Sequence, residues 1–311
     1  MITQNRFTPW LKEEVHESPD KTYRHRLMTE YPHTRDDFLD ELSSYVHAAH
    51  EDARRYLREL FENTLDPFGA FLSFDPTEGY PELLHMQTLK GYFGEIVAGL
   101  IAEHFSPFGE ASWKVPVFLF RYHTVAFQEL ERIRQTGGVA KELPGRTGDD
   151  CLAFQLDEKG QITRYLYCEA KCTSRGNMPD RVAEAYKKVS ESVPVDLQQM
   201  IRILQQKSNT ASTQWLLAIQ QLSFALRKHL PDPNYRTERC DMISYICGVS
   251  PVRGGRTAWL PTEKPHEAYK AQRRLETVEI HLPDVEVLIR KVYGKKDDGA
   301  AEVSLAYTVE D

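Results

Sequence analysis

Residues 148–171 read GDDCLAFQLDEKGQITRYLYCEAK, and this stretch decides the expected fold. Apolar runs at 150–156 and 162–170 predict two strands, and the polar run at 157–160 predicts the turn that joins them into a hairpin. Glu169 and Lys171 are two positions apart on the second strand, so both side chains leave the same face of the sheet. The intervening positions leave the opposite face, which is apolar and suits a core.

Asp150 stands where the loop before the hairpin becomes the first strand. A hairpin brings the entry of its first strand close to the exit of its second, so Asp150 can approach Glu169. Two clustered carboxylates raise each other's pKa unless a cation compensates. Oxygen ligands suit Mg²⁺ or Mn²⁺ rather than zinc, and the carbonyl of Ala170 is a further candidate ligand. Lys171 adds a positive charge that can orient a water or stabilise a phosphate in the transition state.

The stretch GYFGEIVAGLIA at 91–102 predicts a helix that is apolar or small nearly all round and therefore buried. Glu95 is its one charged residue. A lone carboxylate in such surroundings costs free energy unless it is paired or meets a metal. A salt bridge to a core arginine, or a side chain that reaches solvent past its small neighbours, is the alternative interpretation.

The GDD at 148–150 and the EAK at 169–171, on a hairpin that follows a buried helix, resemble the signature of the PD-(D/E)XK nucleases. The resemblance covers roughly residues 85–205 and consists of short motifs. It implies an α/β protein with a restriction-endonuclease-like core, in which helices flank a mixed central sheet. It also implies that Asp150 and Glu169 hold the metal, that Lys171 assists hydrolysis and that Glu95 completes the metal shell. Asp149 is the alternative to Asp150.

Residues 161–207 carry a surplus of basic side chains that can follow a phosphate backbone, although a solvated helix face would look the same. Nucleases of this kind often place a glutamine or a basic residue on the helix after the Glu-x-Lys strand. We therefore expect substrate contacts from Lys187, Gln198 and Arg175. A second basic stretch, RGGR at 253–256, is a weaker candidate.

Periodicity along the 311 residues predicts two parts, a helical N-terminal extension at 1–80 and a nuclease-like domain at 81–311. Residues 1–35 look irregular, and His47 and His50 on the following helix look like surface histidines. The expected elements are helices at 36–63, 84–105 and 123–136, helical segments over 179–229 broken near Pro194, a last helix after Asp284, and strands at 114–120, 241–250 and 276–282.

Composition narrows the function classes. The net charge of −7 means that any nucleic-acid surface must be local. Five cysteines without a CxxC pair argue against a disulfide framework or a zinc knuckle, and no apolar run is long enough to span a membrane. We therefore expect a cytoplasmic protein. A phosphate-binding GxxxxGK[ST] loop is absent from the sequence, which argues against an ATPase.

These features predict a Mg²⁺- or Mn²⁺-dependent endo- or exonuclease that acts on DNA. Its layout resembles the effector subunits of prokaryotic antiviral defence, such as the nuclease subunit of Hachiman-type systems, which implies a protein partner such as a helicase. Self-association into a homo-oligomer is also compatible with the sequence. The alternatives are a stand-alone restriction or repair nuclease, a catalytically inactive nuclease-fold protein that binds nucleic acid or acts as a scaffold, and a nucleotide-dependent phosphoryl-transfer enzyme that uses the GDD carboxylates.

Overall fold

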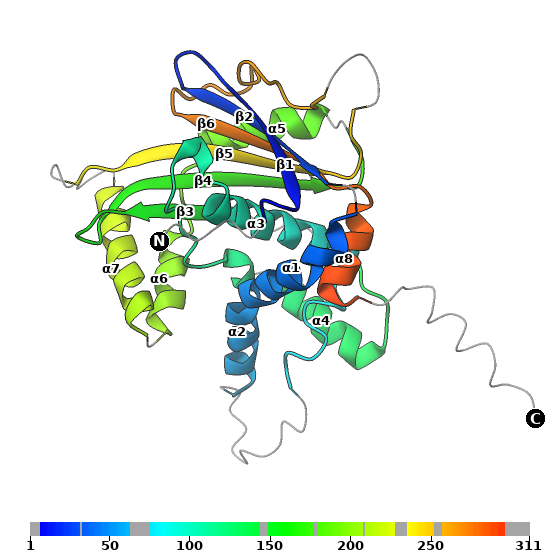
Figure 1. The fold of residues 1–311 in the computed structure, drawn as a ribbon. Coiled ribbons are helices and arrows are strands. Elements are labelled where there is room, and N and C mark those ends of the chain that lie inside the picture. Colours follow the sequence, from blue (N-terminus) through cyan, green and yellow to red (C-terminus); the bar gives the residue numbers. More distant parts are fainter. Residues whose placement is uncertain are drawn as a thin grey trace, which may run out of the picture.

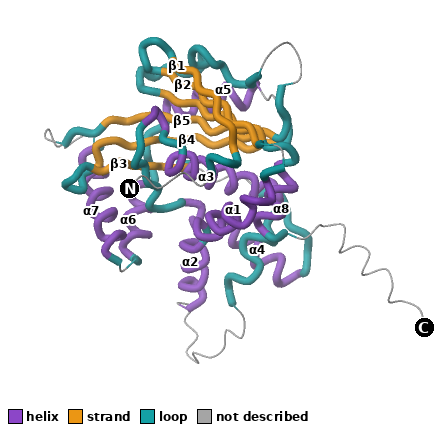
Figure 2. The backbone as a smooth tube through the Cα atoms, viewed as in Figure 1, coloured by secondary structure: helices purple, strands orange, loops and turns teal. Residues whose placement is uncertain are grey.

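The fold is a six-stranded mixed sheet with helices on both faces, and it is described by a computed structural model (Figures 1 and 2). The structure describes residues 7–31, 33–62, 75–122, 124–143, 149–176, 179–207, 209–227, 235–251 and 257–295. The strands are β1 (Leu11–Glu17), β2 (Tyr23–Glu30), β3 (Cys151–Leu156), β4 (Ile162–Thr173), β5 (Glu238–Cys247) and β6 (Leu275–His281). Their order across the sheet is β1-β2-β6-β5-β4-β3.

The four central strands β2, β6, β5 and β4 are parallel, and β1 and β3 pair with them antiparallel at the two edges. Parallel strands need crossover connections and bury both faces, and β6 is buried along its whole length although it carries Glu276 and Glu279. The expected α/β class, a mixed sheet flanked by helices, is confirmed at this level.

Two hydrophobic cores fill the space between the sheet and the helices. The helices are α1 (Arg35–Ala49), α2 (Glu51–Glu62), α3 (Met86–His104), α4 (Thr124–Thr136), α5 (Pro179–Glu191), α6 (Leu197–Gln205), α7 (Thr210–Ala225) and α8 (Val285–Tyr293), with short 3₁₀ turns at Pro107–Gly109 and Leu119–Tyr122. Helices α1, α3 and α8 share the core on one face, whereas α5, α6 and α7 share the core on the other. The hairpin of β3 and β4 therefore has packed helices on both sides.

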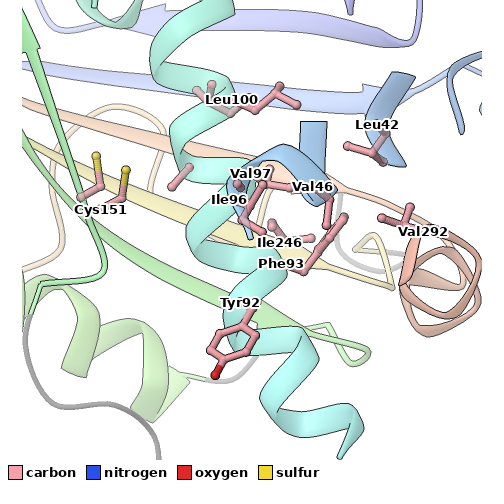
Figure 3. Packing of buried hydrophobic residues seen from close by; sticks show 14 of the residues in the cluster. Leu42, Val46, Tyr92, Phe93, Ile96, Val97, Leu100, Cys151, Ile246 and Val292 are labelled. Atoms are coloured by element: carbon pink, nitrogen blue, oxygen red, sulfur yellow. The ribbon is translucent and has the colours of Figure 1, made fainter. Parts of the chain in front are cut away.

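Helix α3 is buried almost along its whole length, as its sequence predicts. At Gly94 it comes so close to β4 that an added Cβ would lie 3.6 Å from the Cβ atoms of Ala170 and Cys172. Figure 3 shows its apolar side chains gathered with those of α1, α8 and β5, among them Phe93, Ile96, Val97, Leu100, Val46, Val292 and Ile246. This close packing carries Glu95 to the sheet.

The expectation of irregular structure over residues 1–35 is wrong for residues 11–30, which form β1 and β2. Polar residues hid these strands. β1 is an edge strand that exposes all but its first residue, and the buried Arg26 of β2 is neutralised by ion pairs with Glu13 and Glu276. Both strands belong to the same sheet as β6, near the other end of the chain. A division of the chain at residue 80 stays a prediction.

Two further expectations need correction. The strand expected at 114–120 is absent, because only Lys114 pairs with β3, and a 3₁₀ turn covers Leu119–Tyr122. The single helix expected at 36–63 is two helices, which meet at His50.

His50 is fully buried rather than on the surface. Its ring nitrogens lie 3.2 Å and 3.3 Å from the hydroxyls of Tyr80 and Tyr293. Burial lowers the pKa of His50 well below its ordinary value, so the ring is neutral and belongs to the core.

No helix in the described part of the chain is long and apolar enough to cross a bilayer.

Candidate active site

The candidate site lies at an open edge of β4. β3 pairs with β4 only as far as Cys168, while β4 continues to Thr173 beside β5. Beyond Cys168, no described strand covers the other edge, so backbone groups that would normally pair with a neighbour strand point into a pocket. Asp150 uses one of them, because the amide of Ala170 donates a hydrogen bond to its Oδ2 at 2.9 Å. The end of one strand thereby positions a carboxylate beside the next.

The carbonyl of Ala170 faces the same pocket. The N–H and C=O of one strand residue point toward the same side of the strand. Since the Ala170 amide reaches Asp150, its carbonyl also points to the open edge, and Ala170 lines the pocket. A backbone acceptor is therefore available next to the carboxylate.

A pocket of about 310 Å³ occupies this edge, between the N-terminal half of α3 and helix α5. Its wall combines acidic and basic side chains with small ones. The lining residues are Gln87, Thr88, Gly91, Tyr92, Glu95, Glu142, Leu143, Asp150, Ala170, Lys171, Cys172, Arg181 and Lys188. Three carboxylates and three cations face one small volume, an arrangement suited to a charged ligand.

Glu169 lies behind this wall with no exposed side-chain surface and is neutralised by two lysines. Lys171 Nζ is 2.9 Å from its Oε1, and Lys188 Nζ is 2.6 Å from its Oε2. Lys188 Nζ also lies 3.3 Å from Asp150 Oδ1. Lys188 thus joins both carboxylates, and its ammonium occupies the space between them.

The charges in this cluster shift one another's pKa values. Burial, followed by the nearby charge of Asp150, raises the pKa of Glu169 to about 7, although both lysines oppose the change. Burial alone would lower the pKa of Lys188, but Asp150 and Glu169 together outweigh it and raise that pKa above its ordinary value. Lys188 therefore stays charged, whereas Glu169 titrates near neutrality.

Glu95 on α3 and Asp149 before β3 have different surroundings. Glu95 is 8% exposed on the buried helix α3 and lines the pocket. Asp149 faces away from the pocket and accepts hydrogen bonds from the amides of Val195 and Asp196, at 3.4 Å and 3.1 Å. The Asp149 amide in turn donates to Asp196 Oδ2 at 2.8 Å. Asp149 therefore anchors the start of α6, and Asp150 is the carboxylate of the pocket.

Three expected substrate contacts lie outside the pocket. Lys187 and Arg175 are exposed and absent from its wall, and the Gln198 amide donates a hydrogen bond to Ser223 Oγ on α7 at 2.8 Å. The RGGR stretch at 253–256 lies outside the described residues.

Two basic residues of α5, Lys188 and Arg181, line the pocket instead, and their spacing in the sequence could have indicated both. The buried stripe of α5 is Val182, Ala185, Tyr186 and Val189. Lys188 and Arg181 are seven residues apart, so they lie on one flank of that stripe, whereas Lys187 lies nearly opposite it.

A Glu-x-Lys motif can also belong to an exposed hairpin whose glutamate and lysine simply pair with each other, and that interpretation does not fit the structure. An ion pair between Glu169 and Lys171 does form, but Glu169 is fully buried inside a sheet rather than on a solvated hairpin.

Sequence comparison adds no family, because no known family model and no curated protein matches the chain.

Proposed function

We propose that this protein is a nuclease of the PD-(D/E)XK class that uses Mg²⁺ or Mn²⁺ to hydrolyse phosphodiester bonds in DNA. The observation that carries the proposal is the convergence of Asp150, Glu169 and Lys171 at the open edge of a buried strand. A restriction-endonuclease-like core is the finer fold that the proposal implies.

The donor set fits a hard divalent cation. Asp150 and Glu169 would hold it, with the carbonyl of Ala170 and the carboxylate of Glu95 as further oxygen ligands. Glu169 with a pKa of about 7 loses its proton in the physiological range, so the cluster can gain a cation there. When bound, such a cation polarises the phosphodiester and lowers the pKa of an attacking water.

The basic residues divide into two groups by position. Lys171 contacts Glu169 and lines the pocket, so it can hold and orient a water beside the scissile phosphate. Lys188 and Arg181 reach the pocket from α5, where they can bind the phosphate backbone and balance the charge that develops in the transition state. Because Gly91 has no side chain, the α3 side of the pocket is open to a DNA strand.

The biological setting follows from the resemblance alone. We propose an effector of prokaryotic antiviral defence, similar to the nuclease subunit of Hachiman-type systems, that works in the cytoplasm with a helicase or another protein partner. A self-associating form, or a stand-alone restriction or repair nuclease, would use the same site.

An assay on DNA tests the proposal. We expect Mg²⁺- or Mn²⁺-dependent cleavage by the wild-type protein, and a loss of about 100-fold or more in Asp150→Asn and Lys171→Met. Glu158→Gln, in the exposed turn of the same hairpin, serves as the matched control and should cut like the wild type. Equal cleavage in all four proteins, or none with either cation, would contradict the proposal.

A second candidate is a nuclease-fold protein without catalytic activity. The ion pairs of Glu169 with Lys171 and Lys188 favour it, because they satisfy the carboxylates without any metal. Thermal unfolding in a Mn²⁺ series separates the two candidates. A nuclease should unfold at a higher temperature as Mn²⁺ increases, and a scaffold should not respond.

Arg181 provides a test of DNA contact. We expect Arg181→Gln to weaken DNA binding about threefold to tenfold and to reduce the salt dependence of binding by about one phosphate contact. Fluorescence anisotropy at several salt concentrations measures both effects. Arg202→Gln, on the exposed surface of α6, is the control with the same change of charge. An identical salt slope in both variants would remove Arg181 from the DNA contact.

A further inference from the structure

A second group of metal-ligating side chains lies on the α5 face of the sheet, within β5 and β6. Cys247 is the last residue of β5 and pairs in register with His281, the last residue of β6, and Glu279 precedes His281 by two positions on the same face. Their ligand atoms all lie within 4.8 Å of one another. Cys247 and Glu279 have no exposed surface, and His281 is 3% exposed.

His25 on β2 faces the same cluster and is also fully buried. Neither of its ring nitrogens makes a hydrogen bond within the described part of the chain. Its Nε2 lies 3.8 Å from Glu279 Oε2, beyond hydrogen-bond range. His25 pairs in register with Thr277, four positions before His281, so it contacts the Glu279 end of the cluster and lies too far from Cys247 to share an ion with it.

We propose that Cys247, Glu279 and His281 bind a structural zinc ion. A thiolate and an imidazole are softer donors than the oxygen atoms around Asp150, so this site selects zinc over Mg²⁺. The two positive charges of the zinc ion balance the negative charges of the Cys247 thiolate and the Glu279 carboxylate. A buried site with no net charge avoids most of the cost of burying an ion.

Hydrogen bonds from neighbouring groups orient the side chains of Glu279 and His281. The amides of Trp259 and Leu260 donate hydrogen bonds to the Glu279 carboxylate at 2.8–2.9 Å. Ser250 Oγ lies 2.9 Å from Nδ1 of His281, which leaves Nε2 to face Glu279 at 2.5 Å. Such partners fix the tautomer of a histidine and the orientation of a carboxylate in metal sites. Zinc would take the place of the Nε2 proton, the neutral ring would carry its proton on Nδ1 and donate it to Ser250 Oγ, and the Cys247 thiol proton would leave to solvent.

The proposed ion would join two neighbouring strands and a loop. Its ligands come from β5 and β6, and the Glu279 carboxylate already accepts hydrogen bonds from the loop at Trp259 and Leu260. No lysine or arginine in the described part of the chain forms an ion pair with Glu279, although Asp150 and Glu169 are both paired with lysine. Zinc would therefore supply a positive charge beside Glu279, which no lysine or arginine in the described part of the chain supplies.

Metal analysis of the intact protein tests the proposal. The full chain is expressed with added zinc, freed of any affinity tag, dialysed and measured for zinc by plasma mass spectrometry. We expect one zinc ion per chain in the wild type and in Asp150→Asn, and a loss of at least tenfold in Cys247→Ser. Because Asp150→Asn alters only the pocket at β4, its zinc content separates this site from the proposed nuclease site.

Cobalt substitution gives a second readout that reports the thiolate directly. Co²⁺ in the wild type should show a thiolate charge-transfer band in the near ultraviolet and visible bands of tetrahedral cobalt, and Cys247→Ser should lose the charge-transfer band. Circular dichroism establishes whether Cys247→Ser is folded, and if it is not, the wild-type zinc content and cobalt spectrum decide alone. A wild type without zinc and without a thiolate band would overturn the proposal and leave a hydrogen-bonded network. A band that persists in folded Cys247→Ser would also overturn it.

Discussion

Glu169→Gln should abolish metal-dependent DNA cleavage and at the same time stabilise the metal-free protein at pH 8. We expect cleavage to fall by about 1000-fold or more, because the carboxylate that would hold the cation is lost. The opposite effect on stability has a different origin. Burial and Asp150 disfavour the ionised form of Glu169, and a neutral glutamine of nearly the same shape avoids that cost.

The sign of the pH dependence follows from the pKa shift. Glu169 has a pKa of about 7 in the folded protein against an ordinary value of 4.5, so the folded state binds more protons between these two values. The wild type therefore loses stability as the pH rises from 4.5 to about 7 and loses no more from this group above that. The shift corresponds to on the order of 3 kcal/mol at pH 8, which sets an upper limit for the gain in Glu169→Gln.

Thermal unfolding in EDTA at pH 5 and at pH 8 measures this effect. We expect similar unfolding temperatures for the wild type and Glu169→Gln near pH 5, and a value higher by several degrees for the variant at pH 8. Glu158→Gln, which replaces an exposed carboxylate, should follow the wild type at both values. A variant that is less stable than the wild type at pH 8 would mean that the lysine ion pairs outweigh burial.

The sequence predicted the parts of the site that follow from local geometry. Glu169 and Lys171 share a face because strand side chains alternate, and Asp150 meets β4 because a hairpin closes on itself. Glu95 could be found because a charge on a helix that is apolar all round stands out. Each of these inferences uses residues close together in the chain or a period that the sequence itself displays.

The contacts that the sequence did not reveal depend on neighbours far away in the chain. Lys188 reaches Asp150 and Glu169 only because α5 returns across β4. The adjacent Lys187 is also a lysine, so residue type alone did not distinguish the two. β1 and β2 were missed for a related reason. The charges of β2 are balanced by Glu276, 250 residues away from Arg26 in the chain, so an apparently solvated segment is a buried strand.

The group at Cys247 was missed because its ligands follow no metal-binding motif. Cys247 and His281 are adjacent only through the parallel pairing of β5 and β6. The cysteine count argued against a zinc knuckle, which needs cysteines close together in the chain. It carried no information about a group that the sheet assembles from residues of two strands far apart in the chain.

Lys188→Met should destabilise the metal-free protein and strengthen its binding of Mn²⁺. In the metal-free protein the Lys188 ammonium lies between the carboxylates of Asp150 and Glu169, at 3.3 Å and 2.6 Å. Without it, Lys171 alone opposes the repulsion between two carboxylates, and the pKa of Glu169 should rise beyond 7 because one of the two cations that lower it is gone. Removing one partner of a buried ion pair costs about 3–5 kcal/mol, and the partial exposure of Lys188 reduces the expected loss to roughly 1–3 kcal/mol.

The gain in Mn²⁺ affinity has the same cause, because the cation and the ammonium compete for one space between the carboxylates. We expect Mn²⁺ to bind about tenfold more tightly to Lys188→Met at pH 8.5, where Glu169 is largely ionised, since a nearby positive charge no longer repels it. DNA cleavage should still fall, because Lys188 no longer reaches the phosphate. Calorimetric titration with Mn²⁺ and unfolding in EDTA measure the two effects in one pair of proteins.

Lys187→Met is the matched control for the stability measurement, since Lys187 is the next residue on the same helix and is exposed. It should unfold like the wild type in EDTA. Mn²⁺ should raise the unfolding temperature of Lys188→Met more than that of the wild type, because the cation restores the charge balance that the lysine supplied. If Lys188→Met instead keeps wild-type stability in EDTA and binds Mn²⁺ more weakly, Lys188 would have to support the cation rather than stand in its place.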